Sequence, residues 1–172
     1  MNCTTPNVLT PDQQTLLEAW QRHVHAEFVL KDADAALATM TENPYLLMIA
    51  TGTACVGRAA VREQYADHFL PAIPPDLELT SLSQTIGSDR FVEEMVVRFT
   101  HTIEMDWLLP TLRPSGRRAE FIIAAVIGFE NGRVAHEHIY WDQATLLSQM
   151  GVLDHPLAAA GTGSVRQLSR LR

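Results

Sequence analysis

The chain has 172 residues, of which 47% are hydrophobic and 19% charged, and its formal net charge at pH 7 is −7. At about 100–200 residues per domain, this length predicts one domain, or one domain with tails. The high hydrophobic share excludes an intrinsically disordered chain. The acidic balance argues against a nucleic-acid partner, because phosphate contacts need clustered Lys and Arg.

Other simple features point to a cytoplasmic protein. Residues 1–15 lack a basic start followed by an apolar run, so no signal peptide is predicted. No apolar run reaches the roughly 20 residues of a membrane-spanning helix, so no membrane partner is expected. Cys3 and Cys55 are the only cysteines. They imply no disulfide framework, which suits a reducing compartment.

The first part of the chain predicts three helices. Thr10-Pro11-Asp12-Gln13 is a capping-box pattern with Pro at the first helical position, and it predicts a helix that ends near Lys31. Apolar residues at helical spacing give this helix one apolar stripe; they are Leu16, Leu17, Trp20, Val24 and Phe28. Two shorter helices are predicted over residues 35–40 and 59–70.

The remaining chain predicts strands. A short hairpin is expected between the second and third helices, and a run of antiparallel strands after them. Asn131-Gly132 is a strong signal for a hairpin between the last two. The predicted strands cover residues 45–50, 54–56, 77–86, 90–107, 117–129 and 134–142, with a loop over 108–116 and a closing helical turn over 144–150.

This order of elements predicts an α+β fold. Helices segregated from an antiparallel meander pack on one face of its sheet. If the sheet is strongly curved, helices packed over its concave face leave a cone whose mouth takes a small ligand. Residues 121–129 of the strand predicted over 117–129 are mostly apolar on both faces, which predicts a homodimer joined through the sheet face. The predicted domain covers residues 10–153, between a mobile N-terminus over 1–9 and a C-terminal tail over 154–172.

Three short segments near the C-terminus form a recognisable pattern. They are Gly132-Arg133-Val134, Tyr140-Trp141-Asp142, and Leu146 with Gln149-Met150-Gly151. They resemble the pattern of SnoaL-like polyketide cyclases, which is a Gly-basic-aliphatic turn, a strand that ends in aromatic-aromatic-Asp, and then Leu-x-x-Gln-aliphatic-Gly. This family belongs to the nuclear-transport-factor-2-like (cystatin-like, cone-shaped) superfamily. Further similarity lies in Val56-Gly57-Arg58 before a helix with Tyr65, in Thr100-His101-Thr102, and in Pro114-Ser115-Gly116-Arg117.

The resemblance covers residues 12–153 and implies the cone fold. Its functional implication is broad, because the superfamily includes cyclases, isomerases, epoxide hydrolases, dehydratases and non-catalytic binding domains. An epoxide hydrolase needs an Arg that bridges two pocket carboxylates around a water, and the last strand offers no such Arg. SnoaL-type cyclases are thought to use an Asp at the end of the last strand as acid/base, so the resemblance implies this role for Asp142.

The last predicted strand carries the candidate acid/base face. His136, His138, Tyr140 and Asp142 alternate along it and therefore share one face. If this face points into the cone, Asp142 and His138 are the candidate catalytic residues, and Tyr140 and His136 are candidate substrate contacts. The alternative is that Asp142 caps the turn that follows. The His136-x-His138 pair is also compatible with a metal, but no metal site is predicted.

Further candidate substrate contacts lie elsewhere in the chain. His101, Glu104 and Asp106 lie on the neighbouring predicted strand, although the sequence leaves open which face of that strand is inside. The two carboxylates could equally form a solvated charge cluster with nearby arginines. Three large aromatic side chains could line the pocket or pack in the core; they are Trp20, Phe28 and Trp107.

These observations favour a cofactor-free enzyme. It would bind a small apolar, oxygen-bearing molecule and catalyse a proton-transfer step such as cyclisation, isomerisation or hydration. The alternative is a non-catalytic domain of the same fold that binds a small ligand or stabilises a partner.

Overall fold

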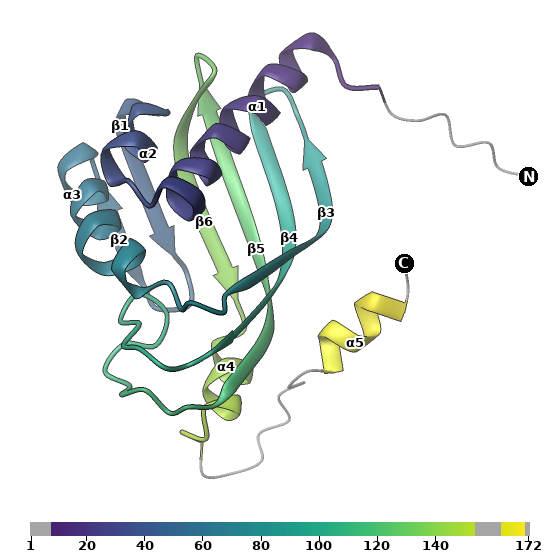
Figure 1. Ribbon diagram of the computed structural model, residues 1–172. Coiled ribbons are helices and arrows are strands. Elements are labelled where there is room, and N and C mark those ends of the chain that lie inside the picture. Colours follow the sequence, from purple (N-terminus) through teal and green to yellow (C-terminus); the bar gives the residue numbers. More distant parts are fainter. Residues whose placement is uncertain (1–7, 154–162, 171–172) are drawn as a thin grey trace, which may run out of the picture.

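The computed structural model describes residues 8–153 and 163–170. Figure 1 shows a curved sheet with helices over its concave face, so the α+β cone architecture is confirmed. The sheet has six strands in the order β2-β1-β6-β5-β4-β3, and all neighbours are antiparallel except β1 and β6. The strands are β1 Met40–Met48, β2 Thr53–Val56, β3 Glu78–Ile86, β4 Arg90–Thr100, β5 Arg118–Glu130 and β6 Arg133–Trp141.

The first helix lies across the concave face (Figure 1) and supplies much of the core. It comprises α1, Pro11–His25, and a π-helical continuation, η1, Ala26–Leu30. The predicted capping box is present, because Thr10 and Gln13 exchange side-chain and backbone hydrogen bonds. The helix ends as predicted at Lys31, whose left-handed backbone (φ 51°) stops it.

The other helices flank the sheet. They are α2 Ala33–Ala38, α3 Arg58–Glu63, the π-helical η2 Gln64–Phe69, the 3₁₀ turn η3 Leu70–Ala72, α4 Gln143–Gln149 and α5 Gly163–Arg170. Among the described residues, no helix is both long and apolar enough to cross a membrane.

Two predicted strand boundaries need correction. β1 begins at Met40 rather than Tyr45, because its first residues pair with β6. β4 ends at Thr100 rather than Trp107, and the chain beyond it forms a loop up to β5. Within this loop the side chain of His101 is buried, and its Nδ1 accepts a hydrogen bond from the backbone N–H of Ser115 at 3.2 Å.

Part of the predicted C-terminal tail forms α5 and packs on the outer face of the sheet. The buried side chain of Val165 contacts a small cluster that includes Leu82, Val96 and Ile122. The rest of the tail, residues 154–162 and 171–172, lies outside the described residues, as do residues 1–7 with Cys3. Cys55 is a free, buried thiol.

Candidate active site: a buried histidine–carboxylate cluster in an apolar cavity

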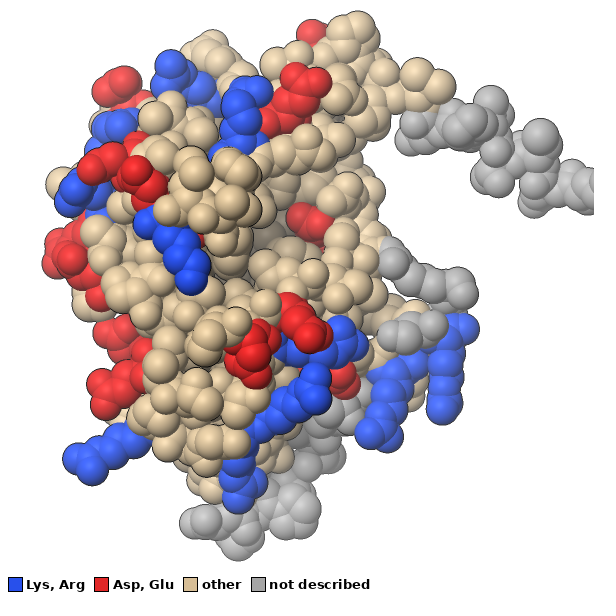
Figure 2. All heavy atoms as spheres, in the orientation of Figure 1, with Lys and Arg blue, Asp and Glu red and all other residues tan. Residues whose placement is uncertain are grey.

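A cavity of about 260 Å³ lies between the helices and the concave face of the sheet. Most of its wall is apolar, with aliphatic residues mainly from the strands and aromatic residues from the helices and from the loop after β4. Its polar lining includes Tyr65 from η2, Glu27 from η1 and Glu137 from β6. Figure 2 shows the hollow below α1, with acidic atoms inside it. A mostly apolar cavity with a few polar groups is the usual form of a small-molecule site.

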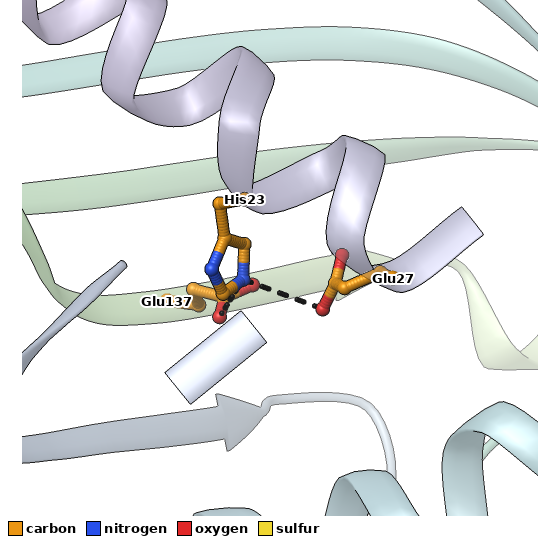
Figure 3. Close-up of side chains that lie close together, drawn as sticks. All are labelled: His23, Glu27 and Glu137. Atoms are coloured by element: carbon orange, nitrogen blue, oxygen red, sulfur yellow. Dashed lines mark ion pairs between the residues drawn. The ribbon is translucent and has the colours of Figure 1, made fainter. Parts of the chain in front are cut away.

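Helix geometry places two of the polar residues together. His23 and Glu27 are four residues apart and therefore lie on the same face of the helix. Figure 3 shows His23 directed toward Glu137 on β6, with Glu27 beside it from the next turn. The π-helical segment begins at Ala26, and such segments are frequent at functional sites. The helix and the central part of β6 thus deliver three titratable groups to one point.

The hydrogen bonds of His23 fix where its protons lie. The hydroxyl of Thr39 donates to the backbone carbonyl of Ala36 at 2.7 Å, so its oxygen must accept from His23 Nδ1, 2.6 Å away. His23 Nε2 faces the carboxyl groups, at 3.4 Å from Glu27 Oε1 and 3.2 Å from Glu137 Oε1. A proton on both ring nitrogens satisfies all three contacts, so His23 is an imidazolium.

Tyr65 completes the cluster. Its hydroxyl donates to Glu137 Oε1 at 2.5 Å, and its oxygen lies 3.2 Å from His23 Nε2. The phenol of Tyr65 and the imidazolium of His23 therefore both contact the same oxygen atom of the Glu137 carboxylate.

Burial and charge set the protonation states of the four groups. Burial alone would lower the pKa of His23, but the carboxyl groups of Glu27 and Glu137 outweigh it and raise that pKa to about 10. Burial raises the pKa of Glu27 despite the opposing charge of His23. For Glu137, burial is outweighed by the charge of His23 and by the hydrogen bonds from His23 and Tyr65, which together lower its pKa. Burial and the two carboxyl groups raise the pKa of Tyr65 well above its usual range.

Two carboxyl groups with opposite pKa shifts suit acid–base chemistry. The charge and hydrogen bond of His23 favour the ionised form of Glu137, a proton acceptor, whereas burial favours the protonated form of Glu27, a proton donor. His23 does not line the cavity. Its role is to supply the positive charge that keeps Glu137 ionised in an apolar surrounding.

The same three residues could hold a metal ion. The ligand atoms of His23, Glu27 and Glu137 all lie within 4.8 Å of one another. The hydrogen bond from Nδ1 to Thr39 is the kind of outer contact that orients a metal-binding histidine. When His23 Nε2 carries a proton, it donates to the carboxyl groups and is not available as a metal ligand.

The expected acid/base face of β6 does not line this cavity. Glu137 and Ile139 point into the cavity, so the alternating residues His136, His138 and Tyr140 lie on the other face of the sheet. There, the ring of His136 stacks on Tyr45 at 4.8 Å and on His138 at 4.7 Å. This corrects the expectation that the even-numbered face points inward.

Asp142 has the capping role that the sequence left open. It is the N-cap of α4 and accepts hydrogen bonds from the backbone N–H of Thr145 at 3.1 Å and from its hydroxyl at 2.6 Å. These bonds lower the pKa of Asp142, which opposes the protonated state that an acid catalyst needs. Asp142 is not part of the cavity lining.

The candidates near the end of β4 also lie elsewhere. His101 is fully buried in the loop after β4, and burial lowers its pKa. Asp106 pairs with His68 at 2.9 Å on the surface, and Glu104 is exposed. None of the three lines the cavity.

All three aromatic candidates line the cavity; they are Trp20, Phe28 and Trp107. Trp20 also stacks on the ring of His23, with 5.5 Å between centroids and 18° between planes. Contact of these three residues with a substrate stays a prediction.

Sequence reasoning missed His23, Glu27, Tyr65 and Glu137 as a group. Two signals were available. The first is the spacing of His23 and Glu27 beside the apolar stripe of the first helix. The second is Glu137 itself, the single carboxyl group on a face of β6 that otherwise carries Ala135, Ile139 and Trp141.

Comparison with known proteins agrees with this architecture. The model of the SnoaL-like polyketide cyclase family matches residues 14–150. The chain belongs to this family. No curated protein matches it.

Several solved structures share the fold of this chain. A putative SnoaL-like polyketide cyclase from Jannaschia sp. CCS1 has a TM-score of 0.70 and 16% identity, over 86% of this chain and 99% of that one. A putative ketosteroid isomerase from Kribbella flavida DSM 17836 has a TM-score of 0.53 and 12% identity, over 76% and 80%. The epoxide hydrolase/cyclase-like enzyme SalBIII, described with pyran ring formation in the polyether salinomycin, has a TM-score of 0.54 and 15% identity, over 77% and 92%.

Proposed function

We propose that this family member is a cofactor-free acid–base enzyme that acts on a small, largely apolar, oxygen-bearing molecule. One observation carries the proposal. Among the described residues, both polar contacts of Glu137 end on Oε1, so its Oε2 is left to accept a proton from a molecule in the cavity.

The reaction begins at a carbon next to a carbonyl group. Glu137 takes the proton from this carbon, while Glu27 donates a proton or a hydrogen bond to the carbonyl oxygen. Return of the proton to a different atom gives an isomer, and attack of the enol carbon on a second carbonyl group closes a ring. His23 remains charged throughout and offsets the charge of Glu137. The cyclase and isomerase descriptions of solved structures with this fold are consistent with such chemistry.

Proton exchange tests the proposal without knowledge of the substrate. β-Tetralone, a bicyclic aromatic ketone, is incubated in D₂O, and loss of its α-proton signal is followed by NMR. The protein should accelerate the exchange, and Glu137→Gln should reduce the acceleration by about 10²–10⁴-fold, the usual contribution of a general base. The control Glu94→Gln removes a carboxyl group on the other face of the sheet, where Glu94 accepts a hydrogen bond from Ser83, and should exchange as fast as the wild type. Exchange should also be unchanged after treatment with EDTA.

The alternative is a non-catalytic ligand-binding domain, and one observation favours it. The polar groups of the cluster are bonded to one another, which is also how a purely structural cluster is satisfied. If β-tetralone binds in the cavity and no exchange is accelerated, the binding domain is the better assignment and the enzymatic proposal fails.

The predicted homodimer, the absence of nucleic-acid and membrane partners and the cytoplasmic location stay predictions. For the homodimer, α5 is relevant because it covers part of the outer sheet face around Val96 and Ile122. A partner would have to use the rest of that face.

A further inference from the structure

A second buried carboxyl group in the cavity differs from Glu137 in its partners. Glu93 lies on the inward face of β4, lines the cavity and is only 7% exposed. Its Oε1 accepts a hydrogen bond from the amide of Gln84 at 2.8 Å, and its Oε2 accepts a long one from the indole of Trp20 at 3.4 Å. Both donors are neutral.

No cation in the described part of the chain compensates Glu93. The ion pairs found within residues 8–153 and 163–170 do not include it. The cavity lining drawn from those residues contains no Lys or Arg. Glu137, by contrast, has the imidazolium of His23 at 3.2 Å. A buried carboxylate with only neutral partners gains strongly from any positive charge brought to it.

The cavity wall around Glu93 suits a cation. Five aromatic residues line the same cavity, and one of them, Trp20, donates a hydrogen bond to Glu93. The others are Phe28, Tyr65, Phe69 and Trp107. The faces of aromatic rings attract organic cations, most strongly when water is excluded. An anionic molecule would find three carboxyl groups and no cationic side chain in this lining.

Glu93 can also be reached from a second side. Together with Trp20, Val24 and Phe28, it lines a groove of about 350 Å³ between α1 and the edge of the sheet. The same four residues line the main cavity. Glu93 therefore stands where the groove and the cavity adjoin.

We propose that Glu93 is a binding site for a basic nitrogen, and that the molecule processed in this cavity is an amine that binds as its ammonium form. The aromatic rings would enclose the apolar part of the molecule, with the ammonium group at Glu93 and the reacting carbon at Glu137. The identity of this molecule as a substrate rests on the proposed function, whereas the ammonium site does not.

A matched pair of ligands tests the ammonium site. Naphthylmethylamine is charged at neutral pH, and naphthylmethanol has nearly the same shape without the charge. Binding is measured for both by calorimetry at pH 7. The wild type should bind the amine about tenfold more tightly than the alcohol, in the range of a desolvated cation near aromatic rings.

Variants then test whether Glu93 is the origin of the preference for the amine over the alcohol. Glu93→Gln should abolish it and leave the affinity for the alcohol unchanged, while Glu94→Gln, on the outer face, should retain it. If Glu93→Gln fails to fold, Glu93→Asp keeps the charge on a shorter side chain and should retain a reduced preference. Equal affinities in the wild type, or an equal loss for both ligands in the Glu93 variant, would overturn the site.

These outcomes are independent of the exchange assay. A protein that prefers the amine but does not accelerate exchange has the ammonium site without the proposed chemistry. A protein that accelerates exchange through Glu137 but binds both ligands equally has the chemistry without the site.

Discussion

The two faces of β6 place histidines in opposite electrostatic situations. On the inner side, His23 meets Glu137 and Glu27, and its pKa rises to about 10. On the outer side, His136 meets the rings of Tyr45 and His138, and burial together with nearby His138 and Arg90 lowers its pKa. The comparison shows that burial alone favours the neutral ring, and that the inner histidine is charged because two carboxyl groups lie next to it.

The largest difference between the two faces should appear when each histidine is removed. His23→Gln leaves two buried carboxyl groups without a cation, so it should lower the free energy of unfolding by about 3–5 kcal/mol. His136→Gln, its control on the outer face, should cost under about 1.5 kcal/mol because no charge depends on it. Urea unfolding measures both. Equal losses would mean that His23 is neutral in the folded protein.

The charge of His23 should also make its contribution pH-dependent. Its pKa in the folded protein, about 10, lies above the ordinary value of 6.5, so its stabilising effect is complete below pH 6.5 and lost as the pH rises toward 10. The lowered pKa of Glu137 acts in the other direction, because its contribution is present above pH 4.5 and lost as the pH falls below that value. The stability difference between wild type and His23→Gln should therefore be largest between pH 4.5 and 6.5. A difference that stays constant up to pH 10 would contradict the ion cluster.

A smaller effect is expected from packing on the outer face. The ring of His136 lies against Gly128, where an added Cβ would come within 1.9 Å of its Cε1 atom. Gly128→Ala should displace this ring and destabilise the protein by about 1–3 kcal/mol, while proton exchange in the cavity stays near the wild-type rate. A large loss of exchange at unchanged stability would link the outer stack to the site.

The smallest effect is expected at Asp142, where the sequence placed catalysis. Asp142→Ala removes the N-cap of α4 and should cost about 1 kcal/mol, with little change in the exchange rate. Thermal unfolding and the exchange assay test the two parts of this expectation. Loss of exchange with unaltered stability would instead restore Asp142 as the acid/base residue.

Much of the fold was predictable because it depends on local signals. The capping box at Thr10, the Asn131-Gly132 turn and the apolar stripe with Trp20 and Phe28 each fix a short piece of chain, and each is present as predicted. The parallel pairing of β1 with β6 was not predictable in this way, because it joins segments that are distant in the sequence.

The face of β6 that points inward was decided only by the tertiary structure. Both faces of this strand carry polar groups, so alternation alone could not distinguish the half with Glu137 from the half with His136 and His138. The sequence determined the family, the curved sheet and its covering helices. Packing of α1 against β6 decided the site, because an ionised Glu137 is stable inside an apolar cavity only where the charged ring of His23 lies beside it.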